Sequence, residues 1–235
     1  MSGTQRTHDE RPDNGSRFRV ELEVAGPFAM FARPDTGGTP TSYPMPTWSA
    51  AKGIFEAVAW RPHVYICPTW VEICRPIRYE RYVTNYGGPL RSRGQQTSNN
   101  NYQLHATILS DVCYRLHGEV FQKTRSSRGK ERPQSRRRRG RDWRPLLKER
   151  FDDRLAQGQT KYTPCLGWKE FIPTYFGPFR PDTLVERSVN EVIPSLLHSM
   201  WEHHSLKPTF KQDWHIVNGI MSYEHQTPSL EVQDA

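Results

Sequence analysis

Arginine and tyrosine side chains interleave between residues 78 and 103, in a segment that is rich in Gly and Asn and has few aliphatic residues. Cationic groups bind phosphates and aromatic faces stack on unpaired bases, so this combination is typical of proteins that hold single-stranded RNA. The alternative is an aromatic surface that packs on a partner protein, and the arginines favour RNA. We expect an exposed hairpin or flap over residues 78–103, with RNA contacts from Arg78, Arg81, Arg91 and Arg93.

A second cationic feature lies between Lys123 and Arg144, where eleven Lys or Arg residues stand against only Glu131 and Asp142. The net charge of the whole chain is +8, so the remainder is close to neutral. Lys and Arg displace counterions from phosphates, and this distribution therefore predicts a polyanionic partner. A solvated, disordered insertion would have the same composition. We interpret residues 123–143 as a basic insertion and expect non-specific nucleic-acid contacts from Arg136, Arg137, Arg138 and Arg139.

RNA cleavage without a metal is a third possibility. It needs a base near the 2′-hydroxyl and an acid or cation at the scissile phosphate. Tyr43, His105 and Lys130 are the candidates for these roles, and nothing in their spacing brings them together. A histidine on a strand, such as His105 or His117, is more often structural.

Other classes of function leave no signature. The sequence has no Walker or G-x-G-x-x-G phosphate loop, no G-x-S-x-G elbow and no H-E-x-x-H zinc motif. Its four cysteines form no Cys-x-x-Cys pair, and the neighbours His203 and His204 cannot face one site on a helix. We therefore expect buried free thiols, no metal and no cofactor. Residues 1–16 are polar and lack the apolar region of a signal peptide, and no membrane span is visible, so we expect a cytoplasmic protein.

The strands and helices that must position these residues can be predicted from the spacing of apolar residues along the sequence. Alternating apolar residues predict strands, and apolar residues at helical spacing, with Thr47 as the cap, predict a helix. The predicted strands are 17–25, 64–77, 104–122 and 166–173, and the predicted helices are 49–60, ended by Pro62, and 144–156. Residues 178–190 are predicted to form a charged connection, followed by apolar segments at 192–200 and 210–223, the latter with a turn at Asn218-Gly219.

This order predicts the α+β class, with an RRM-like or ferredoxin-like core, a flap hairpin and a small β-rich C-terminal domain. We divide the chain into a disordered tail (1–16), an RNA-binding core (17–175) with its flap (78–103) and basic insertion (123–143), and a small C-terminal domain with a tail (176–235). Trp60 is expected in the core, and Trp168 is as consistent with the core as with a ligand contact.

Four ordered blocks resemble the Cas-five proteins of type I-C CRISPR systems. The first is a strand followed by GPFAMFARPD and SYPMPTWSAAKGIFEAVAWRP. The others are CRPIRYERYVTN, HATILSDVCYRLHGEV and RFDDRLAQGQTKYTPCLGWKEF, all in family order across about residues 17–172. The C-terminal third matches more loosely, through Arg180-Pro181 and IPSLLHSMW.

The resemblance implies an RRM-like body with a thumb, which binds the 5′ handle of the guide RNA (crRNA) in a type I Cascade surveillance complex for antiviral defence. It implies contacts with the terminal backbone subunit and the large subunit, and with target DNA only through the complex. Tyr43 and Lys52 occupy motif positions and are further expected RNA contacts.

Family members of this type usually also cut precursor crRNA at the repeat hairpin without a metal. Here the sequence departs from the family, because Ala59 stands where the family's catalytic tyrosine precedes a tryptophan. The family's Lys-His pair is not found either: the candidates after a glycine are Lys130-Glu131 and Arg141-Asp142. A handle-binding subunit without cleavage is therefore the first hypothesis, and an active metal-independent endoribonuclease is the alternative.

Overall fold

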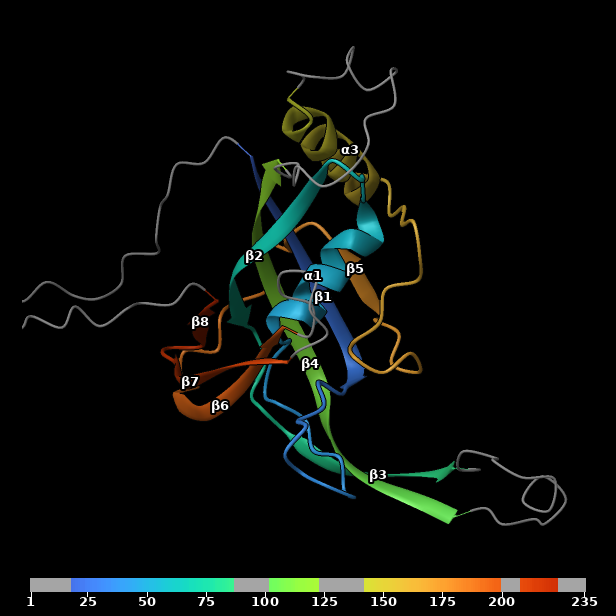
Figure 1. The fold of residues 1–235 in the computed structure, drawn as a ribbon, viewed down its shortest axis with the longest axis vertical. Coiled ribbons are helices and arrows are strands. Elements are labelled where there is room, and N and C mark those ends of the chain that lie inside the picture. The colour runs from blue at the N-terminus through green and yellow to red at the C-terminus, as the bar shows by residue number, and fades with distance from the viewer. Residues whose placement is uncertain (1–17, 87–101, 123–141, 200–207, 224–235) are drawn as a thin grey trace, which may run out of the picture.

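A computed structural model of the chain describes residues 18–86, 102–122, 142–199 and 208–223. Figure 1 shows a long sheet with one helix across its middle and a second helix at one end. In chain order the elements are β1 (Arg19–Ala29), α1 (Trp48–Val58), β2 (Val64–Ile73), β3 (Tyr79–Tyr86), β4 (Tyr102–Gln122), α3 (Arg144–Ala156), β5 (Tyr175–Gly177), β6 (Glu191–Ser199), β7 (Thr209–Ile216) and β8 (Ile220–Ser222).

Two sheets form within the described residues. The larger has the order β5-β1-β4-β2-β8, with β3 paired to β4 outside this path, and the smaller consists of β6 and β7. All pairings between these strands are antiparallel. Together with the two helices α1 and α3, this confirms a mixed class of helices and mainly antiparallel sheet. β4 is the centre of the architecture because its second half pairs with both β1 and β2.

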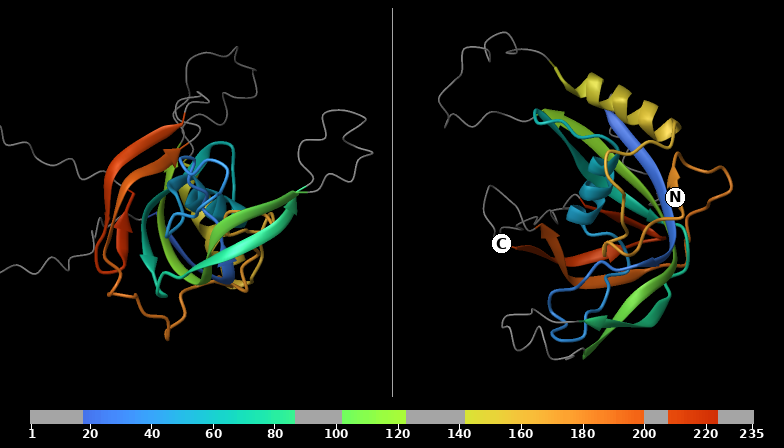
Figure 2. Two further views of the ribbon diagram at one scale, coloured as in Figure 1. Left: turned by 90° about the horizontal axis from the view of Figure 1, so that it is seen from below. Right: turned by 90° about the vertical axis from the view of Figure 1, so that its right-hand side faces the viewer.

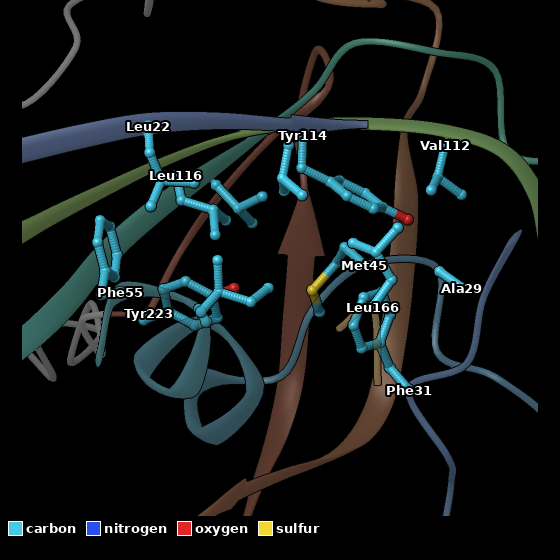
Figure 3. Packing of buried hydrophobic residues seen from close by; sticks show 14 of the residues in the cluster. Leu22, Ala29, Phe31, Met45, Phe55, Val112, Tyr114, Leu116, Leu166 and Tyr223 are labelled. Atoms are coloured by element: carbon cyan, nitrogen blue, oxygen red, sulfur yellow. The ribbon is translucent and has the colours of Figure 1, made fainter. Parts of the chain in front are cut away.

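The core lies between the sheet and α1. Val20, Leu22 and Val24 alternate along β1 and are almost fully buried, as a period-two pattern predicts. Figure 3 shows Leu22 and Leu116 pointing from the sheet towards α1 and Phe55, and Tyr114 pointing towards Met45. Burial of large apolar side chains stabilises the fold by about 1.5–3 kcal/mol for each one.

Helix α1 begins as predicted and ends early. The side chain of Thr47 accepts a hydrogen bond from the backbone N–H of Ala50 and so caps the first turn. The helix ends at Val58, and Ala59 is already extended, so the prediction that it runs to Trp60 was wrong. The carbonyls of its last turn are satisfied from elsewhere, because Lys161 N–H donates to Ala57 and Arg154 donates to Val58.

Helix α3 has the bounds predicted from the sequence, Arg144–Ala156. Leu147, Phe151 and Leu155 are buried at helical spacing, and the ring of Phe151 lies 5.9 Å from that of Phe55 on α1. In Figures 1 and 2 this helix lies at the end of the sheet opposite to β3.

Two expected strands differ in the structure. The strand predicted to run to residue 77 ends at Ile73, shortly before Pro76, which has no N–H to donate to a ladder. Residues 166–173 form a loop, closed by a hydrogen bond from Leu166 N–H to the Phe171 carbonyl, and the strand that follows is β5.

The segment expected to form a separate C-terminal domain packs on the core through its own buried side chains. β8 joins the larger sheet beside β2, and Tyr223 donates a hydrogen bond to the Pro46 carbonyl. Trp214 and Ile216 of β7 belong to the same hydrophobic cluster as β1. Positive φ values at Asn218 (50°) and Gly219 (76°) form the predicted turn between β7 and β8. Independent folding of this segment stays a prediction. None of the described helices is long and apolar enough to cross a membrane.

Candidate nucleic-acid interface

The hairpin of β3 and the first half of β4 projects from the body of the protein as an arm (Figures 1 and 2). Its register runs from Tyr79 opposite Leu109 to Tyr86 opposite Tyr102. β4 is continuous through this arm and the main sheet, apart from an irregular residue, Asp111, with a φ of 50°. The arm is therefore an extension of the central strand.

One face of the arm carries exposed groups that suit RNA. Tyr79 and Val83 are 45% and 44% exposed, and Arg81 lies between them on the same face. A guanidinium nitrogen of Arg81 lies 3.2 Å from Nδ1 of His105 on the neighbouring strand. Arg78, at the base of the arm, is exposed and lies 3.7 Å from Asp111. The structure thus brings together Arg81 and His105 from the predicted set, whereas Arg78 lies at the base of the arm beside Asp111.

The opposite face holds the arm against the body. The ring of Tyr82 meets Phe171 edge-on at 5.5 Å and Trp168 at 6.3 Å. Trp168 and Phe171 stack on each other at 5.8 Å, so the half-buried Trp168 serves as packing support for the arm. The position of the arm therefore depends on the 166–171 loop.

The side chain of Tyr43 is buried in the core and is not exposed on this surface. Only 1% of it is exposed, and its hydroxyl donates to the Ser195 carbonyl and accepts from Leu197 N–H, both at 3.1 Å. Burial raises the pKa of this hydroxyl. Through these two hydrogen bonds to the backbone of β6, the Tyr43 hydroxyl holds β6 against the core.

We predict that Tyr43→Phe lowers the free energy of unfolding by about 1–3 kcal/mol, because it leaves a partly buried N–H and a partly buried carbonyl of β6 without this partner. Urea denaturation measures this change, and Tyr162→Phe, at a tyrosine that is 50% exposed, is the matched control. RNA affinity should be the same for both variants. Reduced RNA affinity with unchanged stability would instead make Tyr43 an RNA contact.

The remaining predicted residues are scattered or lie outside the described ranges. Lys52 forms an ion pair of 2.5 Å with Glu56 one turn along α1. Arg91, Arg93, Lys130 and Arg136 to Arg139 lie outside the described residues, as do His203 and His204. Ala59 is buried, whereas Trp60, expected in the core, is 41% exposed and lies under the ammonium group of Lys161.

Among the described residues, no group of three or more His, Cys, Asp or Glu side chains could hold a metal ion. All four cysteines are free thiols. Cys74 and Cys113 are buried as expected, whereas Cys67 and Cys165 are partly exposed because they lie on strand or loop positions that face outwards.

A charged network on the sheet face opposite α1 is the main feature that sequence reasoning missed. Glu23 is fully buried and accepts hydrogen bonds from Arg115, Arg180 and Thr183. His117 lies 3.0 Å from Glu21 and 3.2 Å from the buried Glu72. Its ring stacks on Trp70 at 4.3 Å. The alternation in β1 placed Glu21 and Glu23 on one face, but it gave no signal that a later segment covers that face.

The network shifts several pKa values. Burial acts to raise the pKa of Glu23, but hydrogen bonds from Arg180, Thr183 and Arg115 lower it on balance. The hydrogen bond from His117 lowers the pKa of Glu21. Burial acts to lower the pKa of His117, and its two glutamate partners raise it on balance.

These directions predict a stability maximum in mildly acidic solution. The lowered pKa values of Glu21 and Glu23 contribute stability that is present above pH 4.5, their ordinary value, and is lost as the pH falls through the folded-state values. The raised pKa of His117 contributes stability that is fully present below pH 6.5 and is lost as the pH rises through its folded-state value. Melting temperatures measured from pH 4 to 9 should therefore be highest in mildly acidic solution and should fall on both the acidic and the alkaline side of this maximum. His117→Gln should remove the decline on the alkaline side; an unchanged decline would contradict the assignment to His117.

Three comparisons with known proteins place this chain among relatives. The family model Cas_Cas5d, described as CRISPR-associated protein (Cas_Cas5), matches residues 20–228. Two similar proteins are both named CRISPR pre-crRNA endoribonuclease Cas5d. The one from Thermus thermophilus is 29% identical over 163 residues, which is 68% of this chain and 64% of that protein, slightly less than two thirds of its length. The one from Mannheimia succiniciproducens is 25% identical over 86% of this chain and 93% of its own.

Solved structures show the same fold at low identity. A crystal structure of a CRISPR-associated protein has a TM-score of 0.63 and 19% identity, covering 89% of this chain and 93% of the other. A functionally uncharacterized protein from Streptococcus mutans has a TM-score of 0.61 and 18% identity, covering 89% and 94%. At these identities the likeness shows the fold alone.

Proposed function

The chain belongs to the Cas5d family of CRISPR-associated proteins, and from this membership we propose that it binds the 5′ handle of crRNA as a subunit of a type I Cascade surveillance complex. The complex is of type I-C in this proposal, and the protein caps its backbone filament in antiviral defence. The arm supports the proposal: Arg81 and His105 lie side by side on a projecting hairpin, next to the exposed ring of Tyr79 and with the exposed Arg78 at its base. Single-stranded RNA is held by such a combination of cations and aromatic faces.

The topology supports an RRM-like interpretation of the body. Apart from β3 and β8, the order β5-β1-β4-β2 follows a β-α-β-β-α-β chain path, with α1 between β1 and β2 and α3 between β4 and β5. This is the path of ferredoxin-like folds. The arm then corresponds to the thumb or flap of the proposed subunit, and the basic insertion (123–143) follows the end of β4.

The alternative function is metal-independent cleavage of precursor crRNA at the repeat hairpin. It is favoured by the names of the two relatives, both pre-crRNA endoribonucleases. In this chain Ala59 is buried and has no hydroxyl, and the Tyr43 hydroxyl is enclosed in the core. Of the two candidates that the structure describes, His105 lies on the arm, next to Arg81.

In the proposed complex the protein contacts the backbone subunit and the large subunit, and it meets target DNA indirectly. Guide RNA is transcribed inside the cell, so the proposal places the protein in the cytoplasm.

The decisive experiment incubates the protein with its own labelled repeat RNA in excess EDTA and measures cleavage and binding together. We expect tight, repeat-specific binding without a cut. A single cut at the base of the hairpin would establish the nuclease, and the absence of any repeat-specific binding would overturn the handle-binding role.

A double variant tests the arm itself. Arg78→Ala with Arg81→Ala should weaken repeat binding by about tenfold or more, because a hydrogen bond to a charged group contributes about 1.5–3 kcal/mol. The salt dependence should also fall, by about 0.7 in slope for each phosphate that is no longer neutralised. Arg187→Ala with Lys211→Ala removes the same charge far from the arm in sequence and is the control. Equal affinity for the two double variants would contradict the assignment.

A further inference from the structure

A stacked aromatic pair lies near the end of the sheet where β4 stops, far from the arm. Tyr65 of β2 and Phe121 of β4 are direct partners in the register. Their ring centroids are 5.7 Å apart and their planes differ by 22°. Phe121 is 37% exposed, although it is a large apolar residue on a regular strand.

This pair shares a face of the sheet with the charged network, the face opposite α1. The network end of that face is covered, since Phe179 packs against His117 and Arg180 binds Glu23. The ring of Phe121 is left accessible beyond this covered area. The two ends of the face therefore differ: one is closed by the protein's own chain and the other presents an aromatic surface.

Two arginines lie at the end of the sheet where β2 begins and β4 ends, and one of them, Arg144, is paired with Asp142 at 2.9 Å. Arg61, which precedes β2, lies 6.0 Å from the ring of Trp143, and the Arg144 guanidinium lies 4.4 Å from the ring of Phe18. The side chain of Gln122, next to Phe121, accepts a hydrogen bond from Trp143 N–H at 3.2 Å.

That hydrogen bond joins the two points between which the chain runs through residues 123–141. By sequence this stretch has ten Lys or Arg residues and one acidic residue, Glu131. The described residues that flank this stretch, Gln122 and Trp143, are thus held together at the end of β4 next to Phe121, and the charge of the stretch attracts a polyanion to this end of the molecule.

We propose that Tyr65 and Phe121 form a stacking platform for an unpaired base of single-stranded RNA, with phosphates near Arg61 and Arg144. The inference rests on the proposed RNA-binding function but assigns a second contact, at the opposite end of the molecule from the arm (Figure 1). The ligand is single-stranded because a paired A-form helix does not offer the faces of its bases to a side chain. An aromatic face recognises any base, so the platform adds affinity without sequence preference.

The test uses four proteins and two RNAs. Wild type, Phe121→Ala, Phe121→Leu and Phe121→Trp are titrated by fluorescence anisotropy against an unstructured single-stranded RNA and against the repeat RNA. Phe121→Trp keeps a π-face and should bind like wild type. Phe121→Ala and Phe121→Leu should bind the unstructured RNA about 5- to 150-fold more weakly, the range for removing one stacked base. Melting temperatures of all four proteins check that folding is intact.

Photocrosslinking gives an independent readout that does not need a substitution. Unstructured RNA containing 5-iodouridine should crosslink to the peptide that carries Phe121 or Tyr65. Unchanged affinity of Phe121→Ala and Phe121→Leu, or crosslinks confined to other peptides, would overturn the platform and would leave the pair as a surface for a protein contact.

The same data separate this inference from the proposed function. If repeat RNA binds to wild type and weakens with Arg78→Ala/Arg81→Ala, but neither RNA binds more weakly to the Phe121 variants, the platform alone is overturned. A wild-type protein that binds neither RNA overturns both.

Discussion

Glu23→Ala is expected to lower the free energy of unfolding by about 3 kcal/mol, the low end of the range for breaking a buried ion pair. Glu23 is fully buried, and its carboxylate accepts from the side chains of Arg115, Arg180 and Thr183 at 3.2, 2.6 and 2.8 Å. Removing it leaves two guanidinium groups beside each other without their shared counterion. The effect stays at the low end because the Arg180 side chain is 36% exposed and keeps access to water.

The measurement is urea denaturation at pH 7, with Glu149→Ala, at an exposed glutamate of α3, as the control. For a chain of this size the effect corresponds to a melting temperature about 6–12 °C lower. A change below that of the control would show that the network does not stabilise the fold. Glu23→Gln keeps the shape of the side chain and removes its charge. Comparing its free energy of unfolding with that of Glu23→Ala therefore separates the ionic contribution from the packing contribution.

Gly167→Ala is expected to cost at least about 3 kcal/mol, from a backbone clash and an unfavourable dihedral angle together. A Cβ at this position would lie 1.8 Å from the carbonyl oxygen of Met30, and the φ of Gly167 is +90°. The loop must approach β1 this closely because the Met30 N–H donates to the Leu166 carbonyl at 2.9 Å.

Gly158→Ala is the matched control. Its φ is +65°, but a Cβ there meets nothing within 4 Å, so only the conformational strain of about 1 kcal/mol remains. If urea denaturation shows the same destabilisation for both variants, the loop that carries Gly167 can shift to accommodate the added Cβ without a loss of stability. Because Trp168 supports Tyr82 of the arm, Gly167→Ala should also weaken binding of repeat RNA, and Gly158→Ala should not.

Local patterns in the sequence were sufficient where neighbours along the chain decide the structure. The cap at Thr47, helix α3 with its bounds, the long strand β4 and the turn at Asn218 and Gly219 were all predicted. In each case the signal lies within a few residues: a side chain that caps its own helix, an apolar period, or a residue that accepts a positive φ. The same patterns predicted an exposed hairpin over residues 78–103; Arg81 lies on β3 of the arm, and its contact with RNA stays a prediction.

The roles of Tyr43, Glu23 and His117 were decided by tertiary structure. Tyr43 was a candidate for RNA contact, but its hydroxyl meets Ser195, 152 positions away in the chain. Glu23 and His117 lie on alternating strands whose charged face would ordinarily be solvated, and a segment from Phe179 to Thr183 covers them. Alternation states which side chains share a face of a strand, whereas the covering of that face depends on contacts between segments far apart in the sequence. The burial, hydrogen-bond partners and pKa values of these three residues depend on those distant contacts, so only the tertiary structure determines them.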